Sequence, residues 1–251
     1  ASNRINTPDV AEEILADGCA DMVSMARPML ADPDFVAKAA AGNAAQIAPC
    51  IACNQACLDH TFGGKISSCL VNPRACYETE LVLKPVESAK SIAVIGAVPA
   101  GLSAAIASAE RGHSVTLFDR ASEIGGQLNL AKQVVGKEEF WGFVDWYRTM
   151  VAHHGITVHL NTEVSANDLT DFDEVVIATG VIPRDPQIEG QNRPNVVSYI
   201  NVLNGTATVG NRVAVIGAGG RPRARRAATP QTGPPDHDDA AQTLQTGQRP
   251  R

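Results

Sequence analysis

Several features are missing from this chain of 251 residues, and each absence excludes a class of protein. No apolar run approaches the roughly 20 residues of a membrane-spanning helix, so we expect no membrane partner. The formal net charge is −6, which argues against nucleic acid as a partner. The six histidines show no HExxH or similar metal-binding spacing. No secretory signal peptide is recognisable, which predicts a cytoplasmic protein whose thiols are kept reduced.

The last part of the sequence lacks apolar residues. Residues 221–251 contain six Arg and three Asp, and Leu244 is their single leucine. The stretch follows a glycine turn that should lead into an apolar helix, yet it shows no helical periodicity. A native segment of this composition would be disordered. We favour translation in a different reading frame, because the change of composition falls inside a motif.

The chain does contain a group of closely spaced cysteines. Four of the six fall within twenty residues, as Cys50, Cys53, Cys57 and Cys69. Their order, C-x2-C-x3-C-x11-C, differs from the paired knuckles of structural zinc sites. Three ligands on one compact turn and one distant ligand are closer to iron–sulfur ligation, so the spacing favours a [4Fe-4S] cluster. Zinc is the first alternative, and free or disulfide-bonded thiols are the second.

Residues 1–49 predict part of a parallel α/β array. A helix is expected to begin at Thr7, a short buried strand is expected over residues 20–26, and a second helix should follow Asp32. Arg27 comes directly after the predicted strand. A basic side chain and free backbone amides at that point of a parallel strand suit a phosphate group.

Residues 91–119 predict a dinucleotide-binding βαβ unit. A buried strand over residues 91–95 runs into a turn with Gly96 and Gly101, an alanine-rich helix follows, and a second strand leads to Asp119. Asp119 lies about twenty residues beyond the glycines, where an acidic side chain can accept the hydroxyl groups of a ribose.

One position of this turn departs from the pattern. The third residue is expected to be glycine, so that the backbone can approach a pyrophosphate, and here it is Val98. A β-branched side chain places methyl groups where the phosphates belong, and it resists a positive φ. We therefore expect the substitution Val98→Gly to raise the flavin content of the protein.

Further α/β elements follow this unit. Residues 137–154 predict an amphipathic helix with a core-facing aromatic stripe, and strands are expected over residues 156–160 and 174–178. A buried strand over residues 212–216 then repeats the opening of the first unit. It leads into Gly217, Gly219 and Gly220. Two such units predict two nucleotide sites, one for a bound flavin and one for a nicotinamide donor.

Seven segments follow one another in a specific order: SNRIN, ADMVSMARPMLADP, CIACNQACLDH, SCLVNPRAC, VTLFD, EIGGQ and VAVIGAGG. Together they resemble the Old Yellow Enzyme and trimethylamine dehydrogenase family of iron–sulfur flavoproteins. Within that family they resemble the NADPH-dependent 2,4-dienoyl-CoA reductases. The resemblance extends over residues 1–220.

The resemblance implies a truncated α/β protein of several parts. Residues 1–49 would be the C-terminal end of an FMN-binding TIM barrel, and 50–84 the cluster segment and linker. Residues 85–182 would form a Rossmann-like FAD-binding domain. Residues 183–220 would begin an NADPH-binding domain, and 221–251 would remain a disordered or out-of-frame tail.

The resemblance also implies the cofactor contacts. The four cysteines match the cluster ligands, and Arg4, Ala26 and Arg27 match FMN contacts. Gln55 lies where the cluster loop approaches FAD. The FAD positions are Ala100, Asp119, Gln127, Lys137 and Val164, together with Gly96 and Gly101 of the turn, while Gly217, Gly219 and Gly220 begin the NADPH site. The substrate pocket and proton donor lie outside the matching segments, so no catalytic residue is assigned.

The resemblance implies an electron route as well. NADPH reduces FAD, single electrons pass through the cluster to FMN, and a conjugated enoyl- or dienoyl-CoA of fatty-acid β-oxidation is reduced. This chain by itself is expected to be inactive. Two alternatives remain: an electron-donor FAD and iron–sulfur subunit of the glutamate synthase type, and a non-enzymatic zinc-stapled fragment.

Overall fold

The computed structural model describes residues 1–216 of the chain. The chain divides into two compact units, one formed by Ala1–Asn192 and one that begins at Arg193. Every strand of the described residues belongs to the first unit, and α8 (Tyr199–Leu203) belongs to the second.

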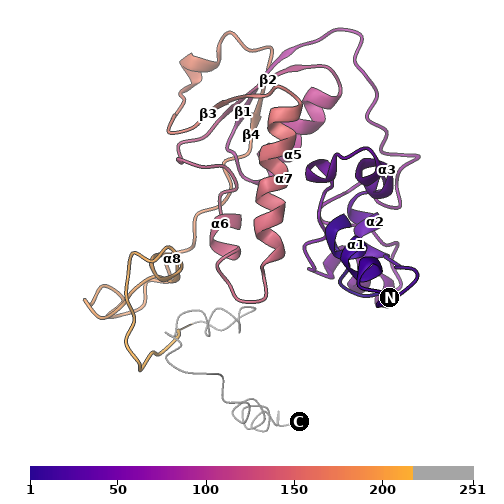
Figure 1. Cartoon of the computed structure of the whole chain (residues 1–251). Helices are drawn as coiled ribbons and strands as arrows, with labels where there is room; N and C mark the ends of the chain where they lie inside the picture. The colour runs from indigo at the N-terminus through magenta and orange to yellow at the C-terminus, as the bar shows by residue number, and fades with distance from the viewer. Residues whose placement is uncertain (217–251) are drawn as a thin grey trace. The chain divides into compact units, whose positions relative to one another are not determined.

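Three short helices open the first unit (Figure 1). α1 (Pro8–Ala16) begins as predicted, because the Thr7 hydroxyl oxygen accepts a hydrogen bond from the Val10 N–H at 3.4 Å. α2 (Arg27–Ala31) and α3 (Phe35–Ala40) follow. The helix expected after Asp32 is therefore confirmed as α3.

The buried strand predicted over residues 20–26 is wrong. This stretch has one isolated β-bridge, between Ser2 and Ser24, and Met22 is 75% exposed. A strand of a parallel sheet is buried only when neighbouring strands flank it and helices cover its faces. Among the described residues Ser2 is its only β partner, so the apolar sequence stays extended and open to solvent.

A four-stranded parallel sheet forms the centre of the first unit. Its strands are β1 (Ser91–Ile95), β2 (Ser114–Phe118), β3 (Thr157–His159) and β4 (Glu174–Ile177), in the spatial order β3-β2-β1-β4. All four were predicted, with ends within one residue of those observed. Ile92, Ala93 and Val94 are buried one after another in β1, while burial alternates along β2, and Val94 and Leu117 are completely buried.

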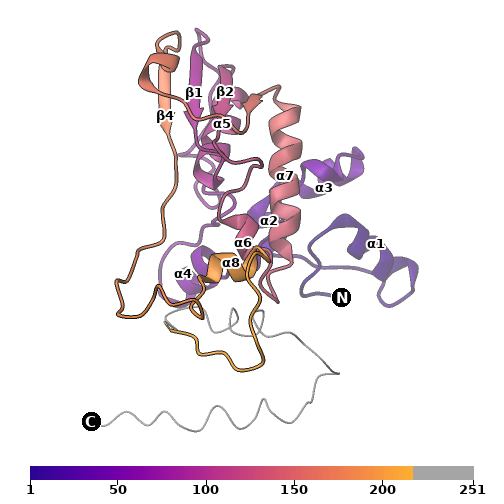
Figure 2. The same ribbon diagram turned by 90° about the vertical axis from the view of Figure 1, so that its left-hand side faces the viewer.

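Two helices form the core together with this sheet. α5 (Pro99–Glu110) packs on β1 and β2, and α7 (Glu139–His153) lies beside α5 (Figure 1). A shorter helix, α6 (Leu128–Ala131), lies beside α7 (Figure 2). The predicted apolar stripe of α7 is buried in full: Phe140, Phe143, Val144, Tyr147 and Val151.

The buried strand predicted over residues 212–216 is also wrong. These residues form no strand, and Ile216 is 74% exposed. The physical reason is that the described sheet contains only β1 to β4, so this apolar run has no strand beside it. The predicted positions Gly217, Gly219 and Gly220 and the predicted tail over residues 221–251 lie outside the described residues. Within residues 1–216, none of the helices has the length and apolarity needed to cross a bilayer.

Candidate functional site

The cysteine segment folds as a tight loop with an uncommon backbone. The φ angle is +52° at Ala52 and +60° at Asn54, a region that residues other than glycine rarely adopt. A π-helical turn, η2 (Gln55–Asp59), follows and carries Cys57, and α4 (His60–Phe62) continues it. Strained residues and π-helical turns concentrate at functional sites. This loop is therefore a candidate binding site on backbone grounds alone.

The four predicted ligands line one small cavity. Its wall includes Cys50, Cys53, Cys57 and Cys69. All four are free thiols of intermediate exposure. The structure thus brings Cys69 to the other three cysteines across the loop that separates them in sequence, as the predicted ligand set requires.

Four thiols without an oxygen or nitrogen donor form a ligand set that both a [4Fe-4S] cluster and a four-cysteine zinc site can use. In residues 1–216 no group of three or more His, Cys, Asp or Glu side chains is placed to hold a metal ion. The cluster expected from the sequence therefore stays a prediction at this site.

Burial raises the pKa of the Cys50 and Cys69 thiols. At Cys50 a backbone hydrogen bond at Ala52 and the Arg27 guanidinium lower the pKa in part, while the neighbouring Cys69 and Cys53 raise it further. Both thiols are therefore protonated at neutral pH, and metal binding would release their protons.

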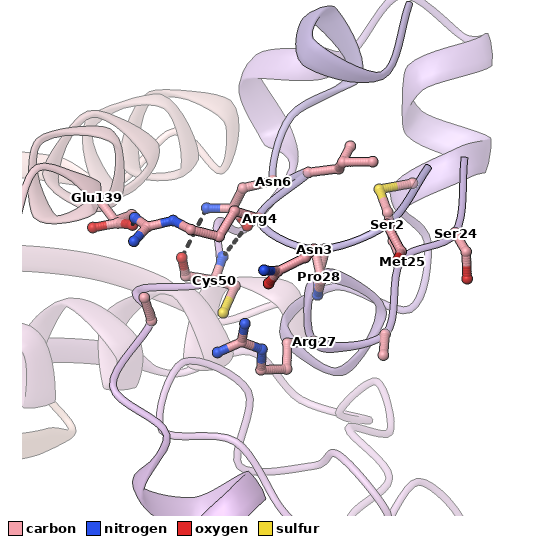
Figure 3. Close-up of a pocket in the computed structure, with 13 residues that line it drawn as sticks. Ser2, Asn3, Arg4, Asn6, Ser24, Met25, Arg27, Pro28, Cys50 and Glu139 are labelled. Atoms are coloured by element: carbon pink, nitrogen blue, oxygen red, sulfur yellow. Dashed lines mark hydrogen bonds and ion pairs between the residues drawn. The ribbon is translucent and has the colours of Figure 1, made fainter. Parts of the chain in front are cut away.

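A larger cavity of about 310 Å³ lies next to the cysteine segment (Figure 3). The three residues predicted to contact FMN, Arg4, Ala26 and Arg27, all line it, and so does Cys50. In Figure 3 the Arg27 guanidinium and the Cys50 sulfur point toward one another. A guanidinium at a cavity wall is suited to bind a phosphate through paired hydrogen bonds.

Arg27 lines both cavities and connects them. Its Nη1 donates a hydrogen bond to Asn54 Oδ1 at 2.6 Å, which ties the start of α2 to the left-handed turn of the cysteine loop. Asn6 connects the N-terminal segment to the backbone of Cys50. Its Oδ1 accepts from the Cys50 N–H at 3.2 Å, and its Nδ2 donates to the Cys50 carbonyl oxygen at 2.8 Å.

Sequence reasoning missed Asn6, Asn54 and Glu139 in this region. Asn54 carried a signal, because asparagine is one of the few residues that tolerate the left-handed conformation. Glu139 carried none: it forms an ion pair with Arg4, which lies 135 residues earlier. The Arg4 side chain is also 69% exposed, so it lies at the rim of the larger cavity rather than inside it.

The nucleotide turn has the backbone that the motif predicts. Gly96 has φ +109°, and a Cβ added there would lie 2.2 Å from the Ala178 carbonyl oxygen. A Cβ added to Gly101 would lie 1.9 Å from the carbonyl oxygen of Gly96. Close packing of the turn against β4 and α5 therefore requires both glycines.

Asp119 follows β2 and holds the turn in place. One carboxylate oxygen accepts a hydrogen bond from the Ala97 N–H at 2.6 Å, and the other accepts from the Ala121 N–H at 2.7 Å. Each oxygen has a further lone pair with which it can accept a ribose hydroxyl. Asp119, which is predicted to bind a ribose, therefore also stabilises the loop itself.

Val98 has an ordinary backbone conformation, but its side chain lies over neighbouring glycines. Its φ of −88° and ψ of 170° are extended, so the expected conflict with a positive φ is wrong. Its side chain covers two glycines instead. Cγ1 lies 2.5 Å from the position that a Cβ on Gly126 would take, and 3.5 Å from the same position on Gly180.

The other predicted FAD contacts are spread along the first unit. Gln127 follows the Gly126 turn, and its Nε2 donates to the Val181 carbonyl oxygen at 2.9 Å. The Lys137 ammonium lies 5.2 Å from the centre of the Phe140 ring. Three positions line neither of the two cavities: Gln55 and Ala100, which are exposed, and Val164, which is half-buried.

Two families of known proteins match this chain. Residues 90–220 match the pyridine nucleotide-disulphide oxidoreductases, and residues 1–46 match the NADH:flavin oxidoreductase / NADH oxidase family. The first match includes the sheet and the nucleotide turn. The second includes α1 to α3 and the predicted FMN contacts, and the cysteine segment lies between the two.

Individual relatives match most of the chain. It is 40% identical over 225 residues to a metal reductase of Desulforamulus reducens, covering 87% of this chain and 34% of that protein. It is 32% identical over 220 residues to a cinnamate reductase of Clostridium sporogenes, covering 87% and 33%. A solved 2-naphthoyl-CoA reductase in complex with 2-naphthoyl-CoA aligns with a TM-score of 0.80 at 34% identity, covering 84% and 32%. The chain spans about a third of the length of these proteins.

Proposed function

Because the chain belongs to the pyridine nucleotide-disulphide oxidoreductase family and carries a segment of the NADH:flavin oxidoreductase family, we propose that it serves a flavin-dependent reduction of a conjugated carbon–carbon double bond. The proposed substrate class is an enoyl- or dienoyl-CoA, with 2,4-dienoyl-CoA as the specific candidate. Relatives named for 2-naphthoyl-CoA and for cinnamate support an unsaturated, carbonyl-conjugated substrate.

The larger cavity is the proposed seat of an FMN phosphate. Arg27 would bind the phosphate oxygens with its guanidinium, because it lines the cavity and is held in place by Asn54. Arg4 at the rim would add positive charge once a ligand competes with Glu139 for it.

The small cavity is the proposed seat of a [4Fe-4S] cluster held by Cys50, Cys53, Cys57 and Cys69. When bound, such a cluster supplies one-electron transfer, which is the chemistry required between two flavins. The chain's own contribution is to hold the four thiols together and to keep them partly away from water. The left-handed Ala52 and Asn54 make the tight loop possible.

The nucleotide turn is the proposed FAD site, and NADPH is the proposed electron donor. Gly96 and Gly101 allow the turn to pack closely, and Asp119 is placed to accept ribose hydroxyls. The arrangement that carries the proposal is the sharing of Arg27 and Cys50 by the two cavities, which gives a flavin phosphate and a thiol-bound group a common wall. The match of residues 1–46 to flavin oxidoreductases favours this function over a glutamate synthase subunit.

Metal analysis of the anaerobically purified chain tests the proposal. We expect about four iron and four sulfide per chain and a brown protein. Replacing any one of the four cavity cysteines by serine should lower the iron content strongly. The matched control Cys19→Ser, at an exposed thiol, should leave it unchanged. One zinc per chain without sulfide would reject the cluster.

The substrate proposal needs the whole protein that contains this sequence. Its NADPH-dependent turnover would be compared for 2,4-dienoyl-CoA, 2-naphthoyl-CoA and cinnamate. Preference for the free acid over both thioesters would reject the proposed CoA-thioester class.

A further inference from the structure

Three segments of the first unit meet at residue 98. The nucleotide turn packs so closely on the end of β4 that the missing Cβ of Gly96 would overlap the Ala178 carbonyl group. The turn that contains Gly126 approaches from the other side. The Val98 side chain fills the space between Gly126 and Gly180, with Cγ1 as its nearest atom to both.

Without that side chain, the surface here would consist largely of exposed backbone. Gly126 has φ +52° and Gly180 has φ +76°, and neither has a side chain to shield its peptide groups. The amino-terminal end of α5 starts directly after Val98, at Pro99. Bare glycine backbone beside the start of a helix is the environment in which a pyrophosphate is bound.

The obstruction comes from the side chain and not from a distorted loop. The extended backbone of Val98 leaves the helix start intact, and Leu102 N–H still bonds to the Val98 carbonyl oxygen at 2.9 Å. Rotation about χ1 offers little relief, because valine carries two methyl groups on Cβ and its χ1 is restricted.

The sequence itself contains the unobstructed version of this turn. The five residues AVIGA occur at 93–97 and again at 214–218. The next residue is Val98 in the first copy and Gly219 in the second. The two copies therefore differ first at the position where the side chain covers the glycine surface.

We propose that the Val98 side chain narrows the pyrophosphate position of the dinucleotide site and thereby weakens its binding of FAD. The inference rests on the proposed assignment of this turn as the FAD site. Glycine at position 98 would restore the backbone surface, and alanine would restore most of it. A larger β-branched residue would keep the site narrow.

A flavin titration of the whole purified chain tests this proposal. The wild type is compared with Val98→Gly, Val98→Ala and the bulk-retaining control Val98→Ile, and FAD binding is followed by flavin fluorescence and by flavin bound per chain after dialysis. We expect the Kd for FAD to fall about tenfold or more in Val98→Gly, and less in Val98→Ala. Removing an overpacked side chain changes free energies by an amount that corresponds to such a change in Kd. Val98→Ile should bind no more tightly than the wild type. Thermal unfolding without flavin shows that each variant is folded, and the alanine variant decides the test if the glycine variant is not.

Equal FAD affinity in all four proteins would overturn the role of Val98 and leave the proposed function intact. Tighter binding by Val98→Ile would overturn it as well. If none of the four binds FAD, the inference fails together with the assignment of the turn as an FAD site. The iron content of the cysteine loop would still report separately on the rest of the proposed function.

Discussion

Gly101 is the residue of the nucleotide turn whose size its surroundings limit most tightly. A Cβ there would lie 1.9 Å from the Gly96 carbonyl oxygen, which is backbone and cannot rotate away. Gly142, on the exposed face of α7, has no atom within 4 Å of the same position. A side chain is therefore excluded at Gly101, whereas Gly142 has room for one.

We predict that Gly101→Ala lowers the free energy of unfolding by about 1–3 kcal/mol, because the turn must move away from α5. The matched control Gly142→Ala should raise it by about 0.5–1 kcal/mol, since alanine favours a helix interior over glycine. Urea unfolding followed by circular dichroism measures both. A neutral Gly101→Ala would show that the turn can relax at little cost.

Some site residues could be predicted from sequence and others could not. The four cysteines share a short segment with a ligand spacing, so their convergence was predictable. The Arg27–Asn54 hydrogen bond and the Arg4–Glu139 ion pair join residues far apart in sequence. No local pattern encodes such pairs, because they depend on how the segments pack.

At the scale of elements, β1 and β4 are joined at their starts by a side chain. The Asp173 carboxylate accepts hydrogen bonds from the Ser91 N–H at 2.7 Å and from its hydroxyl at 2.8 Å. These bonds hold the pKa of Asp173 below its ordinary value, and the bond from the Ser91 N–H has the larger effect. Asp173 thereby fixes the register at the edge of the sheet.

The lowered pKa predicts an acid-sensitive contribution to stability. Above about pH 5 the Asp173 carboxylate is charged in both the folded and the unfolded chain, and its stabilisation is fully present. It is lost as the pH falls from there through the lower folded-state pKa. The difference in Tm between the wild type and Asp173→Asn should therefore be largest above pH 5 and shrink toward pH 3.

Asp171→Asn serves as the charge-matched control, because it removes the same charge at an exposed position two residues earlier. Its Tm difference from the wild type should be small. A Tm difference for Asp173→Asn that stays constant from pH 6 to pH 3 would contradict the prediction.

The elements were predictable where the apolar pattern and the actual neighbours agree. β1 to β4 and α7 follow from short apolar runs and a helical stripe that find partners in this chain. Residues 20–26 and 212–216 have similar apolar runs but no sheet beside them, so the same reasoning failed there. An apolar run predicts a preference for burial, and only neighbouring strands can satisfy it.

At the scale of the whole molecule, the chain changes from one compact unit to the next after Asn192. Residues 181–189 before this point are exposed along their whole length. The sequence predicted a domain boundary at residue 182, from the expected end of the FAD domain, and that boundary stays a prediction. Segments between compact units are the preferred sites of proteolytic cleavage.

We predict that brief trypsin treatment of the native chain produces a fragment that ends at Arg184, within the exposed residues 181–189. Mass spectrometry of the digest identifies the end. The variant Arg184→Gln should lose this fragment and keep any other cleavage products. Earlier cleavage at Arg111 or Arg148, among the helices and strands of the first unit, would contradict the prediction.

Asp119 combines a structural role with the role proposed for it in binding a ribose. Its carboxylate would accept hydrogen bonds from a ribose, and it already accepts them from the backbone N–H groups of Ala97 and Ala121. Replacement of Asp119 by a cationic side chain, a change that alters nucleotide preference, would also remove both of these hydrogen bonds from the turn. Redesign of cofactor choice in this scaffold must therefore keep an oxygen acceptor at residue 119 and seek its selectivity elsewhere.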